Sequence, residues 1–340
     1  MLKVAIVGTG GIARMHGVSI DENLDLELVA SIDIDRNKRE KFAARWGGNA
    51  YATLSECMDE VDVVYVLTPP GLRRKYAVEA LEAGKHVFCE KPLAITAEDG
   101  EAIAETAEKK GLIAMTGFNQ RYRKGYTRLH DVTFSAKFGK PYHFWCQRYG
   151  MGAGAMGKIT THNWRTDQAT LCGMTVESLS HDIDLMRWIM HDEVSSVVGI
   201  TSSTAKNLEG FDNNSHVLLR LESGASAVID ASWSSRVGFN TRGVLGEKGT
   251  AFVSGTDIGN NGIWCSREFH VKTDDDEYEH VEMLQDNLDE KSYMMETDDF
   301  VSAVLTGSKP LVSARDGYET LRVSHAILES SKEAKIVLLR

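Results

Sequence analysis

The chain has few cysteines and few prolines, and it has no excess of positive charge. Its 340 residues include five cysteines, at positions 57, 89, 146, 172 and 265, and five prolines. The cysteines are odd in number and widely scattered, and no two of them form a Cys-x-x-Cys motif. This distribution argues against a disulfide framework or a zinc ribbon, and it predicts reduced thiols in a cytoplasmic protein.

The charge balance and the hydrophobic runs narrow the possible partners. Thirty-eight basic residues against 49 acidic ones give a formal charge of −11, which disfavours nucleic acid and offers no basic patch to an anionic membrane. No stretch approaches the ~18 apolar residues of a membrane span, and the first residues show no secretory signal pattern. We expect a cytoplasmic protein that acts on a neutral small molecule.

The length predicts two domains, and the first third of the chain alternates short apolar runs with helical patterns. Apolar runs separated by helices predict a parallel sheet covered on both faces, a doubly wound α/β Rossmann fold. The predicted strands are 3–8, 26–32, 61–67, 86–89 and 113–117, and the predicted helices are 12–20, 36–46, 74–83 and 97–110.

Beyond about Arg121 the pattern changes to β-like segments joined by short turns. It predicts an α+β domain with an open-faced, mainly antiparallel sheet. We place a dinucleotide-binding domain at residues 1–121 and a substrate-binding and oligomerisation domain at 122–340, with the final helix, 314–332, packing back on the first domain. The acidic run Asp274–Glu277 is interpreted as a solvated hairpin turn.

A glycine-rich turn follows the first predicted strand. Gly8, Gly10 and Ala13 fit the pattern G-x-G-x-x-A, and the turn also includes Gly11 and Ile12. The first glycine permits a tight turn, the second lets a pyrophosphate approach the backbone, and the alanine lets the helix pack on the sheet. The helix N-terminus then offers free N–H groups to the phosphates.

An acidic residue at the end of the second strand bears on the choice of nicotinamide cofactor. Asp33 lies 25 residues after Gly8, near the ~20 expected for a carboxylate that binds the adenosine ribose. Such a carboxylate repels a 2′-phosphate, which favours NAD. Arg36 could pair with that phosphate, so NADP stays open as an alternative.

Two loops at the carboxyl ends of later strands are expected to border the nicotinamide half of the cofactor. One begins with Thr68 and Pro69, and the other contains Glu90, Lys91 and Pro92. The proline biases Lys91 towards an extended backbone, and the ammonium could position a substrate hydroxyl. Each loop taken alone also fits an ordinary surface turn.

A helix predicted over 175–190 has two distinct faces. Leu179, Ile183, Met186 and Met190 recur at helical spacing and are expected to pack on the sheet.

On the other face of this helix Glu177, His181 and Asp184 recur at helical spacing, and Trp188 continues the stripe. A histidine one turn from a carboxylate suits a general base, although the same spacing fits a solvated polar stripe. We predict no metal, because hydride chemistry does not require one.

Together these features resemble the Gfo/Idh/MocA family of oxidoreductases over nearly the whole chain. The glycine motif is common to many enzymes, whereas Glu-Lys-Pro after its strand, followed by a distant His-x-x-Asp helix, is highly specific. The matching stretches are the start G-T-G-G-I-A, residues 77–92, 117–121, 163–165, 180–184 and 309–330.

The resemblance implies an NAD(P)-dependent dehydrogenase acting on CH–OH groups, with Lys91 as the catalytic lysine and His181 as the proton acceptor. Glu177 stands where family members often carry an aspartate, and Arg73 and Arg74 stand where a histidine is usual.

The resemblance also implies a homodimer or homotetramer formed through the open sheet. It places four further residues in the substrate pocket beside Glu177 and His181, namely Asn119, Arg121, Trp164 and Arg165.

The predicted reaction is hydride transfer between a secondary hydroxyl of a cyclic polyol or sugar, of inositol or pyranose type, and the nicotinamide. Two alternatives stay open. One is a glycoside hydrolase that keeps NAD and oxidises its substrate transiently. The other is a non-catalytic NAD- or sugar-sensing regulator, which the presence of both Lys91 and His181 disfavours.

Overall fold

The computed structural model describes residues 1–340 except 152–171, 205–209, 258–267, 283–288 and 340. The chain forms two compact units. The first contains residues 1–119 and 289–321, and the second contains residues 120–288 and 322–340. The domain boundary between residues 121 and 122 stays a prediction. Among the described residues, no helix is long and apolar enough to cross a membrane.

The first unit contains the predicted parallel sheet. All five of its strand pairings are parallel, and the order β3-β2-β1-β4-β5-β6 reverses direction beside β1. The doubly wound fold is therefore confirmed. The strands are β1 (Leu2–Val7), β2 (Leu26–Ile32), β3 (Asn49–Tyr51), β4 (Val63–Val66), β5 (His86–Glu90) and β6 (Ala114–Gly117).

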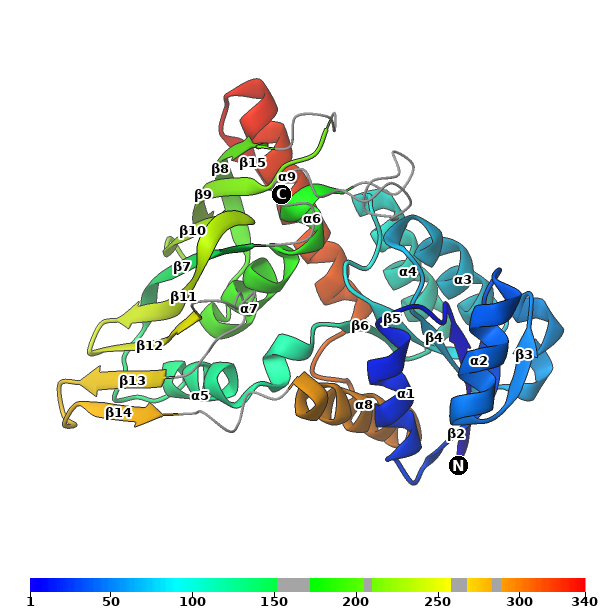
Figure 1. The fold of residues 1–340 in the computed structure, drawn as a ribbon. Helices are drawn as coiled ribbons and strands as arrows, with labels where there is room; N and C mark the ends of the chain where they lie inside the picture. The colour runs from blue at the N-terminus through cyan, green and yellow to red at the C-terminus, as the bar shows by residue number, and fades with distance from the viewer. Residues whose placement is uncertain (152–171, 205–209, 258–267, 283–288, 340) are drawn as a thin grey trace. The chain divides into compact units, whose positions relative to one another are not determined.

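Helices cover both faces of this sheet. Figure 1 shows α1 and α8 on one side of the strands and α3 and α4 on the other. Right-handed crossovers that run in opposite directions from β1 place α1 and α3 on opposite faces. The α-helices are α1 (Ala13–Asp21), α2 (Arg36–Trp46), α3 (Pro70–Glu82), α4 (Ala97–Lys110), α8 (Asp289–Thr306) and the first part of α9 (Ala314–Glu333). Short 3-10 turns cover Leu54–Glu56, Met58–Glu60 and Asn119–Tyr122.

Local capping explains why two of these helices begin and end where the sequence predicts. The Asp35 carboxylate accepts hydrogen bonds from the second and third backbone N–H groups of α2, and Thr96 caps α4 in the same way. Gly111 ends α4 in the left-handed conformation, with φ of 65°. Each device satisfies backbone groups that a helix terminus leaves without partners.

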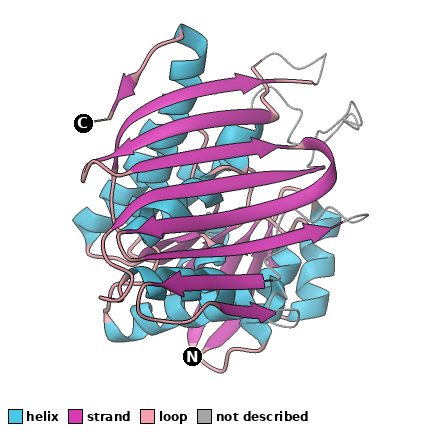
Figure 2. Cartoon of the chain, turned by 90° about the vertical axis from the view of Figure 1, so that its left-hand side faces the viewer, coloured by secondary structure: helices cyan, strands magenta, loops and turns pink. Residues whose placement is uncertain are grey.

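The second unit contains a nine-stranded mixed sheet in the order β14-β13-β12-β11-β7-β10-β9-β8-β15, seen face-on in Figure 2. The pairing of β7 with β10 is parallel, and the other pairings are antiparallel. The strands are β7 (Pro141–Met151), β8 (Val194–Ser202), β9 (Asn214–Leu221), β10 (Ser226–Ser232), β11 (Ser234–Gly246), β12 (Gly249–Asp257), β13 (Glu268–Thr273), β14 (Glu279–Glu282) and β15 (Val337–Leu338). The acidic run Asp274–Glu277 forms the exposed turn between β13 and β14, as predicted.

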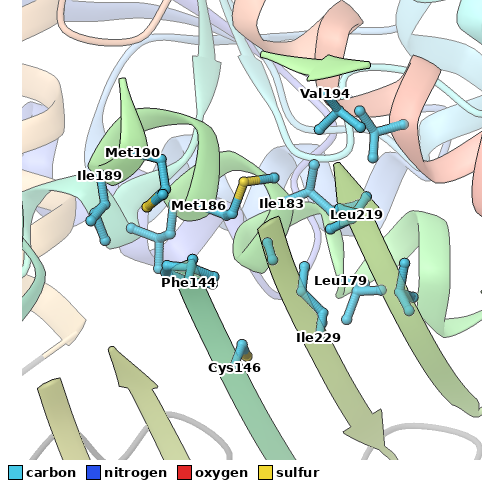
Figure 3. Packing of buried hydrophobic residues seen from close by; sticks show 14 of the residues in the cluster. Phe144, Cys146, Leu179, Ile183, Met186, Ile189, Met190, Val194, Leu219 and Ile229 are labelled. Carbon is cyan, nitrogen blue, oxygen red and sulfur yellow. The ribbon is translucent and has the colours of Figure 1, made fainter. Parts of the chain in front are cut away.

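One face of this sheet packs on the helices α5 (Lys124–Thr133), α6 (Gly173–Glu177) and α7 (Ser180–Met190) and on the end of α9. Figure 3 shows Ile183 and Met186 of α7 above the strand residues Phe144 and Ile229. The predicted apolar stripe of this helix is buried in that core. Burial of such side chains stabilises the fold by ~1.5–3 kcal/mol each.

The helix predicted over 175–190 is in fact two helices, α6 and α7, with Ser178 and Leu179 between them. Asp212 fixes the start of α6, because its carboxylate accepts hydrogen bonds from the backbone N and the hydroxyl of Thr175, at 2.9 and 2.7 Å. Gly173 has φ of +62°, and a Cβ there would lie 2.1 Å from the Asp212 carboxylate. Burial raises the pKa of Asp212 to about 6.

We expect Asp212→Asn to change how stability depends on pH. Because the folded-state pKa of Asp212, about 6, lies above the ~3.9 of an unperturbed aspartate, its protonated form stabilises the native state below pH 4. This contribution is lost as the pH rises from 4 through 6. Between pH 4 and 7 the wild type should therefore lose roughly 3 kcal/mol relative to the asparagine variant. Urea unfolding of both proteins at several pH values measures the difference, and a difference that does not change with pH would contradict this assignment.

Candidate active site

The glycine-rich turn has the geometry that a dinucleotide pyrophosphate requires. Gly8 has φ of +96°, and a Cβ there would lie 2.9 Å from the backbone N of Thr68. At Gly10 and Gly11 an added Cβ would meet no described atom within 4 Å, so space lies over these residues. Ile12 is the N-cap residue of α1 and has no side-chain cap hydrogen bond. The turn therefore fits a phosphate group at a helix N-terminus.

Asp33 follows β2 and lies beside this turn. One oxygen of its carboxylate accepts hydrogen bonds from the backbone N and the hydroxyl of Thr9, at 2.9 and 3.1 Å. Arg36 points its exposed guanidinium to Glu40, at 2.6 Å. The carboxylate is thus held next to the glycine turn, where a ribose hydroxyl could bond to it.

The loop predicted to begin with Thr68 and Pro69 is shorter than expected. The helix predicted to begin at Arg74 begins at Pro70, because proline has no N–H to leave without a partner and its fixed φ suits the first helical position. The early start brings Arg73 onto α3 as a buried residue. Its guanidinium donates to the carbonyl oxygens of Thr68, at 2.9 Å, of Glu90, at 2.7 Å, and of Pro92.

Glu90 ends β5, and each oxygen of its buried carboxylate makes a polar contact. One oxygen lies 3.1 Å from Nε2 of His16 on α1, and the other accepts the backbone N–H of Lys91 at 2.8 Å. Burial alone would raise the pKa of Glu90, but the hydrogen bond with His16 and the charges of His16, Arg73 and Lys91 outweigh it and lower that pKa. The carboxylate therefore stays ionised and fixes the backbone at Lys91.

His16 itself is fully buried in the first unit. Its ring makes edge-on contacts with the rings of Tyr65, Phe88 and Tyr293, at centroid distances of 5.0 to 5.7 Å. The aromatic packing holds the imidazole in one orientation. The pair His16–Glu90 therefore joins the helix that follows the glycine turn to the strand that immediately precedes Lys91.

Glu177, His181 and Asp184 are all buried in the second unit. These residues therefore do not form the solvated polar stripe that their spacing also fitted. Trp188, on the same helix as His181 and Asp184, is half-buried. Glu177 ends α6 and His181 lies in the first turn of α7.

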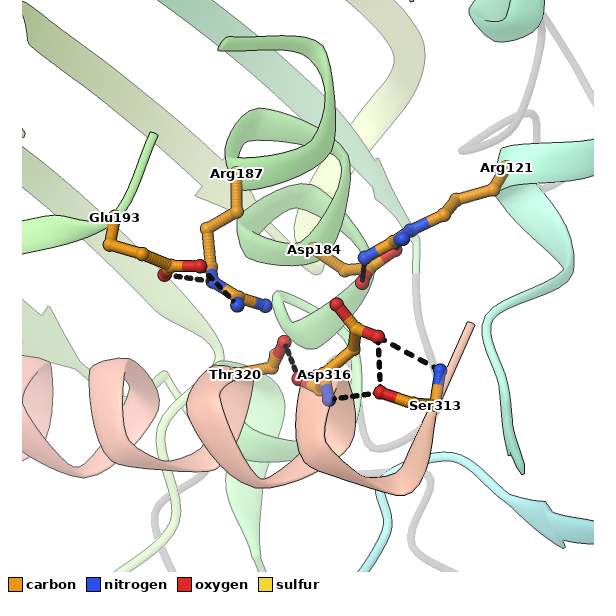
Figure 4. A network of polar contacts seen from close by, with 7 residues as sticks. All are labelled: Arg121, Asp184, Arg187, Glu193, Ser313, Asp316 and Thr320. Carbon is orange, nitrogen blue, oxygen red and sulfur yellow. Dashed lines mark hydrogen bonds and ion pairs between the residues drawn. The ribbon is translucent and has the colours of Figure 1, made fainter. Parts of the chain in front are cut away.

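Asp184 binds Arg121, one of the residues predicted to line the substrate pocket. Its carboxylate binds the Arg121 guanidinium through two hydrogen bonds, at 2.9 and 2.6 Å (Figure 4). The same guanidinium lies 5.7 Å from the Trp188 ring. A bidentate pair of this kind fixes both side chains in direction.

A second ion cluster lies under the first turn of α7. The fully buried carboxylate of Asp182, next to His181 in the chain, binds Nε of Arg148 and Nε of Arg242, each at 2.7 Å. Burial would raise the pKa of Asp182, but the two guanidinium groups outweigh it and lower that pKa. This cluster ties the start of α7 to the strands β7 and β11 and so fixes the backbone beside His181.

The remaining predicted site residues lie in separate places. Asn119 is buried in the first unit and donates to the Ser292 hydroxyl at 3.2 Å. Trp164 and Arg165 lie outside the described residues. Lys91 belongs to the first unit and His181 to the second, so their meeting at one reaction centre stays a prediction.

Sequence analysis did not identify three residues that support these groups, namely His16, Arg73 and Asp182. His16 lies six residues after Gly10, on α1, and its pairing with Glu90 spans 74 positions. The two arginines at 73 and 74 were visible in the sequence, but no periodic pattern indicated that Arg73 is buried while Arg74 is exposed.

A doubly wound parallel sheet with a glycine turn before α1 and an acidic residue after β2 is typical of a dinucleotide-binding domain. Comparison with known proteins identifies the family. Residues 2–118 match the GFO_IDH_MocA domain described as "Oxidoreductase family, NAD-binding Rossmann fold", and residues 135–339 match the corresponding C-terminal alpha/beta domain. The chain belongs to this family, and it is an NAD-binding dehydrogenase.

Relatives and solved structures agree with this assignment. The chain is 27% identical over 353 residues to a myo-inositol 2-dehydrogenase of Thermotoga maritima, covering 99% of this chain and 98% of that protein. It is 37% identical to a glucose-6-phosphate 3-dehydrogenase of Bacillus subtilis over 139 residues, 41% and 40% of the two chains. Its fold matches a levoglucosan dehydrogenase in complex with NADH, with a TM-score of 0.87, 20% identity and coverage of 100% and 99%.

We expect Arg73→Met to loosen the loop that carries Lys91. The substitution leaves buried carbonyl oxygens without their donor, which should lower the free energy of unfolding by roughly 2–4 kcal/mol. It should also lower kcat, because the backbone of Glu90 and Pro92 loses its shared anchor. Chemical unfolding and steady-state kinetics measure the two effects.

Arg74→Met is the matched control. Arg74 is exposed and lies 3.4 Å from Asp99, and an exposed pair contributes about 1 kcal/mol or less. Equal effects of the two substitutions would show that Arg73 does not hold this loop.

Proposed function

We propose that this protein oxidises a secondary hydroxyl of a cyclic polyol or sugar, of inositol or pyranose type, with NAD as the hydride acceptor. The observation that carries the proposal is the anchored Lys91 loop. A buried, ionised Glu90 and a buried Arg73 fix the backbone on both sides of this lysine, at the carboxyl edge of the strands. In a doubly wound sheet that edge faces the cofactor crevice.

The residues would divide the chemistry between them. Gly8, Gly10 and Gly11 would admit the pyrophosphate, and Asp33 would bind the adenosine ribose. Bound NAD supplies the site that accepts the hydride. Thr68, Pro69 and Glu90 would border the nicotinamide half, together with Lys91. NAD is preferred over NADP because the Asp33 carboxylate would repel a 2′-phosphate, while Arg36 is engaged with Glu40.

His181 would accept the hydroxyl proton as the C–H bond breaks, and Lys91 would hold that hydroxyl and favour its deprotonated form. Glu177, which ends α6 four residues before His181, would orient the imidazole. Asn119, Arg121, Trp164 and Arg165 would line the substrate pocket. The Arg121 guanidinium is already held by two hydrogen bonds to Asp184. It would therefore present its positive charge to the substrate in a fixed direction.

The choice of substrate class rests on the relatives. A relative that matches over the full length is named a myo-inositol 2-dehydrogenase, and a partial match is named a glucose-6-phosphate 3-dehydrogenase. Both names describe oxidation of a ring hydroxyl, which requires a base for the proton and an acceptor for the hydride. Lys91 and His181 would together provide the base that takes the hydroxyl proton.

We expect Lys91→Met and His181→Ala each to lower kcat by roughly a hundredfold or more, as loss of a general base or its partner does. NADH binding by the His181→Ala variant should be unchanged, because the glycine turn and Asp33 lie in the first unit. Absorbance assays with NAD and NADP over cyclic polyols, aldoses and glycosides, together with NADH fluorescence titration, measure both.

Lys85→Met is the matched control, since Lys85 lies at the opposite end of the same strand, just before β5. It should keep full activity. Full activity of Lys91→Met or His181→Ala would contradict the roles proposed here. Release of an aglycone without net NADH would instead favour the glycoside hydrolase alternative, and NAD binding without turnover of any compound would favour a regulator.

We infer that the open face of the nine-stranded sheet binds a second copy of the chain. Leu218 on β9 is 58% exposed between the buried Val217 and Leu219, and it pairs across the strands with the exposed Val198. Ile200, two residues further on β8, is 66% exposed. Apolar side chains gathered on a sheet face favour association.

Leu218→Lys combined with Val198→Lys should therefore shift the protein to a smaller species in size-exclusion chromatography with light scattering. Ile34→Lys changes an isoleucine of the first unit that is 88% exposed, and it should leave the mass unchanged. A wild-type protein that is monomeric at micromolar concentration would overturn the inference.

A further inference from the structure

The hairpin β13–β14 carries a cluster of metal-ligating side chains outside the proposed active site. Glu268 and His270 lie two residues apart on β13 and so share one face of the strand. His280 on β14 is the direct cross-strand partner of His270. One ligand atom from each of these three residues lies within 4.8 Å of the others.

One distance within the cluster is that of a filled site, and another is longer. Nε2 of His270 lies 3.2 Å from a carboxylate oxygen of Glu268, and Nε2 of His280 lies 4.0 Å from the same oxygen. Donor atoms of a tetrahedral site with bonds of ~2.0–2.1 Å lie roughly 3.3 Å apart. The His280 side chain is 40% exposed, so it can move the short distance that a bound ion would require.

His270 is held in the orientation that a ligand needs. Its ring stacks between Phe252 of β12, at 4.3 Å, and His280, at 4.6 Å, in a row across three neighbouring strands. Its Nδ1 lies 2.6 Å from the Tyr278 hydroxyl, which directs Nε2 towards Glu268. A second polar partner on the other ring nitrogen is the usual support of a metal-binding histidine.

The register of the hairpin also places two negatively charged side chains opposite each other, where a bound cation would offset their charge. Glu282 on β14 is the direct partner of Glu268, and carboxylates directly opposite each other on a sheet repel. The same face of the hairpin thus carries two paired carboxylates next to two paired imidazoles. A divalent ion bound by Glu268 and the two imidazoles would offset this repulsion.

We propose that Glu268, His270 and His280 form a binding site for a divalent transition-metal ion, with Zn²⁺ as the ion that the ligand set fits. Two imidazoles with a carboxylate suit Zn²⁺, whereas Ca²⁺ and Mg²⁺ prefer oxygen ligands alone. The site lies on the sheet of the second unit and does not depend on the proposed hydride transfer. Sequence analysis predicted no metal and did not single out this cluster, since the two histidines are ten positions apart and come together only through the hairpin.

The test uses the full chain after treatment with a chelator, and Zn²⁺ alone as the probe. Isothermal titration and metal analysis after dialysis should give one Zn²⁺ per chain. The affinity should fall roughly tenfold or more in His280→Gln and in Glu268→Gln. Tyr278→Phe, which keeps all three ligands and removes the hydroxyl beside Nδ1 of His270, should weaken binding by roughly tenfold.

His143→Gln is the control, because His143 lies on β7 of the same sheet and bonds to Ser226 at 2.8 Å. It should bind Zn²⁺ like the wild type. Circular dichroism and thermal unfolding would confirm that each variant folds. Absence of one-to-one binding in the wild type, or equal affinity in the wild type and the ligand variants, would overturn the proposal.

Discussion

The buried carboxylate of Glu90 is the constraint on which the first unit depends. An ionised carboxylate in the protein interior costs several kcal/mol unless hydrogen bonds and opposite charges compensate it. Here the compensation comes from His16 on α1 and from the backbone N–H of Lys91, with Arg73 of α3 nearby. The groups that keep this carboxylate ionised are therefore the same groups that fix the proposed catalytic lysine.

The second unit applies the same principle to the other proposed catalytic residue. Asp182 is fully buried between Arg148 and Arg242, and it immediately follows His181. Removal of either guanidinium would leave a poorly compensated charge, which typically destabilises a protein by ~3–5 kcal/mol. In both units, the residue proposed to touch the substrate is thus next in the chain to a buried carboxylate. The hydrogen bonds that this carboxylate needs also fix the backbone beside that residue.

Much of the fold could be predicted from the sequence, because the signals involved are local. The helices α2 and α4 end where their capping residues lie, and β2 coincides with its apolar run. The start of α3 at Pro70 was missed, since two prolines and a glycine read as a turn although proline also suits the first helical position. The break between α6 and α7 was missed because neither a proline nor a glycine marks it at Ser178 and Leu179.

The candidate site could be predicted only as far as sequence spacing reaches. The glycine turn, Asp33 and Lys91 follow strands at fixed positions, so their placement follows from the order of elements. The spacing of Glu177 and His181 also fitted a solvated polar stripe, and only tertiary packing shows that both residues are buried. His16 with Glu90, and His270 with His280, are pairs that the chain assembles across strands and helices. A single sequence carries no record of such pairings, which is why supporting residues and the hairpin cluster emerge only from the folded chain.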